Sequence, residues 1–169
     1  EELKRFAPYA TDALVPAQDY FASIQGEGHS FHHNYPLVGR SQEMAQMEAF
    51  VRDPKAKALK ISGKGGEGKS RLLWELAHTV CAKPGSPAVL FLNPHSTGDL
   101  TLALWDKDAP RIIVVDDAHR IERVSHELLG RVREAEATKL VLATRPQGNE
   151  VLDERLREHG FPSPQVLAV

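Results

Sequence analysis

Cysteine is nearly absent from this sequence, which has one, Cys81, in 169 residues. A lone cysteine cannot form an internal disulfide, so nothing points to an oxidising compartment. Long apolar runs are missing as well, since none approaches the roughly 18 residues that a membrane-spanning helix requires. No charged-then-apolar leader opens the chain. These absences predict a cytoplasmic protein that has no membrane partner.

An excess of charge of one sign is also lacking. Lys and Arg number 21 against 23 Asp and Glu, and the formal net charge is −2. The two signs are interspersed, which argues against a surface built to bind nucleic acid, so nucleic acid is not the expected partner. A hydrophobic share of 41% is enough for one globular domain with a core. The first residue is Glu1 rather than Met, so we expect a piece of a longer protein.

Strand-like and helix-like segments alternate from residue 37 onwards. Before that point, residues 1–36 mix Pro, Gly, aromatics and His without a sustained period, which predicts an irregular N-terminal arm or linker with a short helix near 17–24. Strands are predicted over 58–62, 88–92, 111–115, 139–143 and 165–169, and helices over 41–52, 72–80, 97–104, 121–132 and 150–158. This alternation is typical of α/β proteins. We therefore predict one three-layer α/β domain over 37–169, with a five-stranded, mostly parallel sheet and helices on both faces.

A glycine-rich loop joins the first predicted strand to the helix after it. It runs Gly63-Lys64-Gly65-Gly66-Glu67-Gly68-Lys69-Ser70, followed by Arg71, which is the pattern of a Walker A phosphate loop. Glycines let successive backbone N–H groups turn inward around an anion, and the start of a helix adds further unpaired N–H groups. We expect Lys69 to reach the phosphates of ATP or GTP and the Ser70 hydroxyl to supply one ligand to Mg²⁺. Together with the alternating segments, this loop predicts a P-loop NTPase fold for residues 37–169. The alternative is a glycine-rich turn that binds nothing.

Glu67 is unusual within this loop, because an acid beside phosphates repels them. We expect its side chain to point outward into solvent.

Two aspartates, Asp116 and Asp117, directly follow the strand predicted over 111–115. Mg²⁺ at a phosphate loop usually has a second anchor, a carboxylate at the end of a neighbouring strand. We expect Asp116 to be that anchor, through water, and Asp117 to orient or deprotonate the attacking water. The alternative is that the two acids cap the next helix.

Thr144 and Arg145 follow the strand predicted over 139–143, at the edge where ligands of open α/β sheets bind. Arg145 is therefore a candidate contact for the γ-phosphate, the alternative being a solvated turn residue. A polar strand end of this kind fits the P-loop class in which this strand lies between the loop strand and the acidic strand.

Four segments in this order resemble the STAND ATPases, the signal-transduction ATPases with numerous domains, over residues 37–169. They are Leu37-Val38-Gly39-Arg40 with Glu43, Gly65-Gly66-Glu67-Gly68-Lys69-Ser70-Arg71-Leu72-Leu73, Val115-Asp116-Asp117-Ala118-His119 and Ala143-Thr144-Arg145. The resemblance implies that Val38 and Arg40 lie by the adenine and that Arg145 senses phosphate. ATP is expected over GTP because no guanine-reading Asn-Lys-x-Asp is present.

In that family the nucleotide acts as a switch: ADP holds a closed monomer, and exchange or hydrolysis permits oligomerisation and activates an attached effector. The resemblance thus implies an ATP/ADP-binding switch domain of a signalling or defence regulator, with slow hydrolysis and unknown effector and sensor domains. The family continues into a helical lid and a winged-helix domain, which we expect to be absent here. Weak affinity and slow or undetectable turnover are then expected of this chain, because water would not be excluded. An AAA+-type remodelling or loader ATPase and a module that binds nucleotide without turnover are the alternatives.

Overall fold

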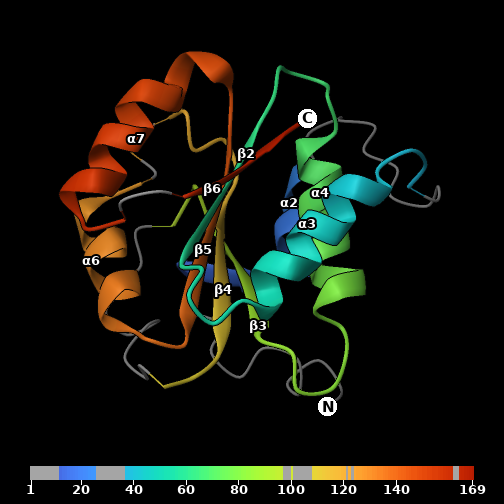
Figure 1. Ribbon diagram of the computed structural model, residues 1–169, viewed down its shortest axis with the longest axis horizontal. Helices are drawn as coiled ribbons and strands as arrows, with labels where there is room; N and C mark the ends of the chain where they lie inside the picture. The colour runs from blue at the N-terminus through green and yellow to red at the C-terminus, as the bar shows by residue number, and fades with distance from the viewer. Residues whose placement is uncertain are drawn as a thin grey trace.

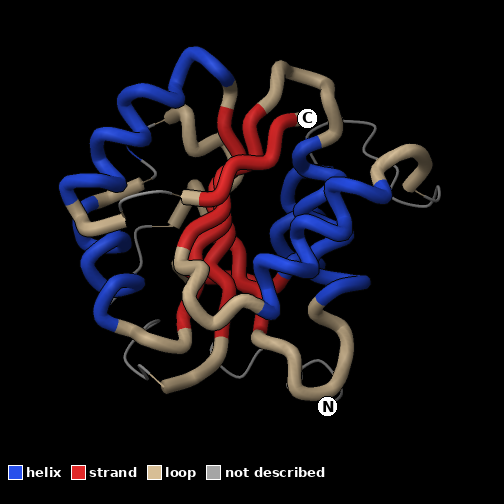
Figure 2. The backbone as a smooth tube through the Cα atoms, in the orientation of Figure 1, coloured by secondary structure: helices blue, strands red, loops and turns tan. Residues whose placement is uncertain are grey.

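The computed structural model describes residues 12–25, 37–96, 100, 108–120, 122, 124–161 and 164–169. In this part of the chain, one sheet lies between two layers of helices (Figures 1 and 2). The helices on one face are α6 (His126–Glu134) and α7 (Asn149–Glu158), and those on the other are α2 (Ala17–Gln25), α3 (Ser41–Arg52) and α4 (Lys69–Glu75). The predicted three-layer α/β architecture is confirmed.

The sheet has six strands within the described residues, in the order β1-β3-β4-β5-β2-β6. They are β1 (Leu14–Pro16), β2 (Ala58–Ser62), β3 (Ala88–Leu92), β4 (Arg111–Val115), β5 (Thr138–Thr144) and β6 (Gln165–Ala168). All neighbours run parallel except β1, which is antiparallel to β3.

The five predicted strands are therefore present, and the sixth, β1, comes from residues that we assigned to an irregular arm. That part of the expectation is wrong because three residues are too few to show a period in sequence. Pairing with β3 orders them instead, with Leu14 opposite Leu92 and the Leu14 side chain fully buried. The short helix expected after them is α2, whose Tyr20 stacks on Phe91 of β3 at 4.7 Å between ring centroids.

Strand β5 lies between β2 and β4, with Leu140 paired to Ala58 on one side and to Ile113 on the other. This is the order that the polar end of β5 predicted. Parallel neighbours end at the same edge of a sheet. The carboxyl ends of the loop strand, the acidic strand and β5 therefore lie side by side (Figure 1).

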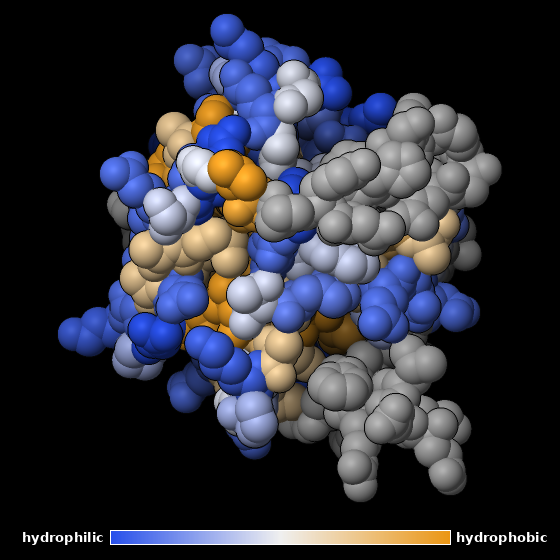
Figure 3. All heavy atoms as spheres, turned by 90° about the vertical axis from the view of Figure 1, so that its right-hand side faces the viewer, coloured by the Kyte–Doolittle hydropathy of each residue, from blue (hydrophilic) through white to orange (hydrophobic). Residues whose placement is uncertain are grey.

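The core has two halves because successive side chains of a strand face opposite sides of the sheet. On β2, Leu59 and Ile61 belong to the half under α3 and α4, whereas Ala58 belongs to the half under α6 and α7. Lys60 points to that second side as well, is 4% exposed, and bonds Asp153 of α7. Where Figure 3 draws this side of the molecule in colour, hydrophilic residues alternate with smaller hydrophobic areas.

Two predicted helices differ in extent from the structure. The one expected over 121–132 is α6, which begins only at His126 because the Ser125 side chain caps it by accepting a hydrogen bond from the Leu128 amide. The one expected over 72–80 starts at Lys69 as α4 and continues as a π-helical turn, η1 (Leu76–Val80). Most of the predicted helix over 97–104 lies outside the described residues. Among the helices that are described, none is long and apolar enough to cross a membrane.

Candidate functional site

The glycine-rich loop joins β2 to α4, as predicted. Gly66 and Gly68 have φ values of 82° and 89°, in the left-handed region that glycine adopts without strain. Gly63 has no room for a side chain, since a Cβ there would lie 2.6 Å from Val169 Cγ2. The structure thus requires glycine at three positions of the motif, and left-handed glycines are what an inward-turned row of N–H groups needs.

Lys69 is the first residue of α4 and is 8% exposed. Its Nζ donates hydrogen bonds to the carbonyl oxygens of Gly63 and Lys64, each at 2.7 Å. The ammonium group is therefore held inside the curve of the loop by the loop's own backbone. A cation in this place could neutralise an anion that the loop amides hold.

Ser70 and Asp116 come from different elements and meet at the same point. The Ser70 hydroxyl donates to Asp116 Oδ2 at 2.9 Å, and the Asp117 amide donates to Asp116 Oδ1 at 2.9 Å. Burial, with the charge of Asp117, raises the pKa of Asp116 above its usual range, and the Ser70 hydrogen bond opposes that rise. A hydroxyl and a carboxylate oxygen side by side are hard ligands of the kind Mg²⁺ prefers. The residues present therefore fit a magnesium ion.

Asp117 has the only positive φ of the described residues other than glycine, at 53°. Its backbone carbonyl accepts from the Arg120 amide at 2.9 Å, and the Ala118 amide donates to Ala143 O of β5 at 2.7 Å. This tight turn leaves the Asp117 side chain 39% exposed, while Asp116 is buried. The two acids thus have different environments, one beside Ser70 and one open to solvent.

His119 was assigned no role from the sequence, but its Nδ1 lies 3.8 Å from Asp117 Oδ1. It is packed against the turn after β5 so closely that a Cβ on Gly148 would lie 2.6 Å from His119 Cβ. Its position two residues after Asp117 was the signal that could have found it.

Arg145 is exposed at the end of β5, next to the loop. Its guanidinium carbon lies 3.9 Å from the position that a Cβ on Gly65 would take. The preceding residue, Thr144, accepts a hydrogen bond at its carbonyl from the Gly63 amide at 3.2 Å. The end of β5 therefore touches the loop at two points.

Arg40 also reaches the loop. Its Nη2 donates to the carbonyl oxygen of Glu67 at 2.9 Å, and its Nη1 donates to Glu43 Oε1 at 2.7 Å. The hydrogen bond from Arg40 lowers the pKa of Glu43. Val38 is 82% exposed, and Arg71 pairs with Glu75 along α4. The assignment of Val38 and Arg40 to the adenine stays a prediction.

The expectation that Glu67 points outward is wrong, although the contact that its side chain makes remains exposed to solvent. Its side chain folds back over the loop, where Oε2 accepts a hydrogen bond from the backbone N–H of Lys64. A carboxylate that accepts from an amide makes a charge-assisted bond, which is stronger than a bond between neutral groups.

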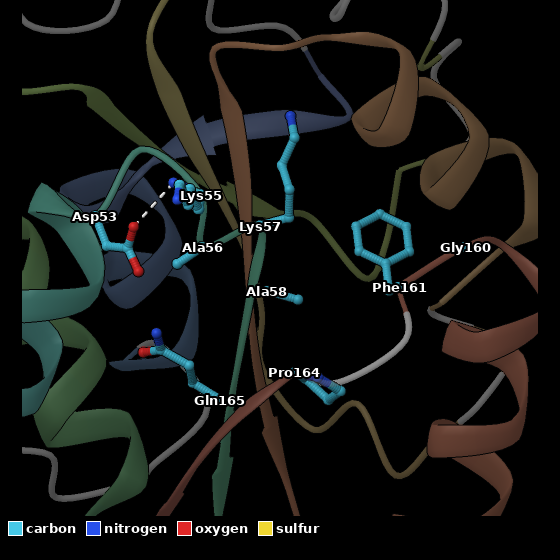
Figure 4. Close-up of a pocket in the computed structure, with 9 residues that line it drawn as sticks. All are labelled: Asp53, Lys55, Ala56, Lys57, Ala58, Gly160, Phe161, Pro164 and Gln165. Carbon is cyan, nitrogen blue, oxygen red and sulfur yellow. Dashed lines mark hydrogen bonds between the residues drawn. The ribbon is translucent and has the colours of Figure 1, made fainter.

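A separate cavity of about 310 Å³ lies at the amino ends of β2 and β6, the ends away from the loop (Figure 4). Its lining residues are Asp53, Lys55, Ala56, Lys57, Ala58, Gly160, Phe161, Pro164 and Gln165. Lys57 is engaged elsewhere, since its Nζ donates to the carbonyls of Ala135 and Glu136 at the end of α6. Nowhere in the described part of the chain do three or more His, Cys, Asp or Glu gather as a metal site. The loop therefore remains the stronger candidate.

Comparison with solved structures places the fold. A closed-state cryo-EM structure of Hsp104 with ATPγS and FITC casein matches 95% of this chain with a TM-score of 0.65 and 14% identity. An S. cerevisiae Hsp104:casein complex in an extended conformation also matches 95%, with a TM-score of 0.63 and 13% identity. C. elegans PCH-2 matches 75%, with a TM-score of 0.52 and 18% identity. The chain spans only 31%, 30% and 40% of the matched chains in those three structures, respectively.

None of the curated proteins matches the sequence. The family model for Novel STAND NTPase 5, however, matches residues 36–156, which include the glycine loop, both aspartates and Arg145. The resemblance to STAND ATPases is thereby confirmed, and the fold is similar to that of the Hsp104 structures. This chain belongs to the Novel STAND NTPase 5 family and is a nucleotide-binding NTPase domain.

Proposed function

We propose that this domain is the ATP/ADP-binding switch of a cytoplasmic signalling or defence regulator that binds nucleotide with Mg²⁺ and hydrolyses ATP slowly. The observation that carries the proposal is that four groups lie at the carboxyl ends of three neighbouring strands: the Lys69 ammonium, the Ser70–Asp116 pair, Asp117 and Arg145. A loop that turns glycine N–H groups and an ammonium inward is suited to phosphate oxygens.

Each residue has a part in this proposal. Backbone amides of the loop from Gly65 to Ser70 hold the phosphates, since those of Gly63 and Lys64 are bonded to Thr144 and Glu67, and Lys69 neutralises the phosphate charge. Ser70 and Asp116 hold Mg²⁺, which when bound supplies positive charge to the phosphate oxygens. Asp117 orients the attacking water and accepts its proton, for which its partial exposure leaves room. Arg145 contacts the terminal phosphate from the end of β5.

In this proposal the site senses the terminal phosphate of the nucleotide as well as hydrolysing ATP. The Arg145 guanidinium carbon lies 3.9 Å from where a Cβ on Gly65 would be. If Arg145 contacts the terminal phosphate as proposed, loss of that phosphate removes a contact at the end of β5. The turn after β5 leads into α7, which offers a route by which the state of the nucleotide could reach the surface. In the full-length parent, we propose that this change controls self-association and an attached effector.

The test is isothermal calorimetry with Mg-ATP and Mg-ADP on this chain and on the full-length parent. Lys69→Ala is expected to weaken binding by about 10- to 100-fold, because a hydrogen bond from a charged group contributes about 1.5–3 kcal/mol. The charge-matched control is Lys83→Ala, at an exposed residue away from the site, which should bind as the unmutated protein does. Absence of nucleotide binding by the unmutated full-length protein would refute the proposal.

Turnover separates the roles of the two aspartates. In the full-length parent, Asp117→Asn is expected to lower ATP hydrolysis at least tenfold while leaving ATP affinity within about threefold. Ser70→Ala should instead weaken the dependence of binding on Mg²⁺. Equal turnover in Asp117→Asn and the unmutated protein would remove Asp117 from the mechanism.

A further inference from the structure

Both the side-chain carboxylate and the backbone carbonyl of Glu67 accept hydrogen bonds. Its carboxylate accepts the Lys64 N–H, and its own carbonyl accepts from the Arg40 guanidinium at 2.9 Å. The carboxylate keeps its negative charge and would repel phosphates, so its presence in this loop calls for a structural explanation.

One peptide group of the loop is hydrogen-bonded to a cation through its carbonyl and to an anion through its N–H. The unit that joins Gly63 to Lys64 consists of the Gly63 carbonyl and the Lys64 N–H. The carbonyl accepts from Lys69 Nζ at 2.7 Å, and the N–H donates to Glu67 Oε2. A peptide plane can turn only if both of these charge-assisted bonds break, so its orientation is set while both remain.

The space for this carboxylate exists because residue 63 is glycine. Glu67 Oε2 lies 2.7 Å from where a Cβ on Gly63 would be, so any side chain at position 63 would displace it. The first glycine of the motif therefore has a local purpose here besides the turn itself. It leaves room for the acid four residues later.

Arg40 connects this arrangement to the start of α3. The guanidinium bridges Glu43 Oε1 of α3 and the Glu67 carbonyl, at 2.7 Å and 2.9 Å. The segment before α3 thus supports the loop at the residue whose side chain holds the Lys64 amide. Support from outside the loop limits how far Glu67 itself can move.

We propose that Glu67 is a positioning residue, which holds the Gly63–Lys64 peptide in the orientation in which the loop takes phosphates, with Arg40 keeping Glu67 in place. Glu67 acts through the backbone and does not contact the nucleotide. The expected effect of Glu67 on affinity rests on the proposed nucleotide binding. Its effect on the orientation of the Gly63–Lys64 peptide does not.

The first test therefore needs no nucleotide. Amide hydrogen exchange at Lys64 is measured by NMR in the full chain and in Glu67→Gln, Glu67→Ala and Glu154→Ala. Glu67→Ala is expected to speed Lys64 exchange about tenfold or more, because it removes a charged acceptor. Glu67→Gln keeps an oxygen acceptor and should stay within about threefold. Glu154→Ala, which removes an exposed acid from α7, should change nothing. Unchanged Lys64 exchange in Glu67→Ala would overturn the proposal.

The second test is calorimetry with Mg-ATP on the same variants. Glu67→Ala is expected to weaken binding about 5- to 20-fold, and Glu67→Gln is expected to restore most of the affinity. If both variants bind more tightly than the unmutated chain, repulsion outweighs positioning and the proposal fails. If the unmutated chain and its full-length parent bind no nucleotide, the proposed function fails, and Lys64 exchange still decides whether Glu67 holds the peptide.

Discussion

The ion pair between Lys60 and Asp153 gives the sharpest stability test. Lys60 sits on β2 and is 4% exposed, and its Nζ lies 2.6 Å and 2.7 Å from the two carboxylate oxygens of Asp153 on α7. Asp153→Asn keeps the shape of the side chain and removes its charge. The Lys60 ammonium is then left in a buried place with a neutral neighbour, which is costly because water cannot replace the lost partner.

The size of the effect follows from the exposure of the two partners. Removing one partner of a fully buried pair costs about 3–5 kcal/mol. The Asp153 side chain is 39% exposed, so water screens part of the interaction. We therefore expect a loss of about 2–3 kcal/mol in the free energy of unfolding, which for a chain of this size corresponds to a Tm lower by roughly 4–12 °C.

The assay is urea and thermal unfolding followed by circular dichroism. Glu154→Gln makes the same acid-to-amide exchange at the neighbouring exposed position and should stay within about 0.5 kcal/mol. Adding Lys60→Met to Asp153→Asn removes the unpaired charge and should recover most of the loss, since an apolar replacement of similar size is often neutral. A loss below about 0.5 kcal/mol for Asp153→Asn, or a double variant no more stable than the single one, would refute the reasoning.

Three further predictions concern Cys81, Gly148 and Asp116. Burial raises the pKa of the Cys81 thiol to about 12 from 9.0, so at pH 8 its reaction with a disulfide reagent should be roughly 1000-fold slower in the native chain than in urea; comparable rates would contradict this. Gly148→Ala would put a Cβ 2.6 Å from His119 Cβ and is expected to cost about 1–3 kcal/mol in urea unfolding, whereas Gly130→Ala, where a Cβ meets nothing within 4 Å, should not destabilise the fold. Without Mg²⁺, the raised pKa of Asp116 means that the folded chain keeps a proton that the unfolded chain releases above about pH 3.8, so ionisation of this group lowers the free energy of unfolding as pH rises. Asp116→Asn should therefore gain stability relative to the unmutated chain between about pH 4 and 8. No gain would show that burial is not the dominant cause of the raised pKa.

Local sequence was sufficient for much of this molecule. The apolar β-branched run of β4 and the apolar periods of α3 and α7 determine those elements, because each pattern repeats within one segment. The phosphate loop was equally predictable, since its glycines, lysine and serine lie within one short segment, and a single turn determines its backbone geometry. The order of β2, β5 and β4 followed from the polar strand ends.

Contacts between distant segments had to come from the tertiary structure. β1 forms a strand because it pairs with β3, where Leu14 lies opposite Leu92. Arg40 bonds to the loop because the folded chain brings the start of α3 next to Glu67. The direction of the Glu67 side chain was predicted wrongly, because the sequence does not show which way a side chain points. Its carboxylate turns back to the Lys64 amide in a space that Gly63 leaves open. The sequence by itself therefore determined which residues form the phosphate loop, and the tertiary structure decided what holds that loop in shape, because the supporting atoms belong to segments that meet only when the chain is folded.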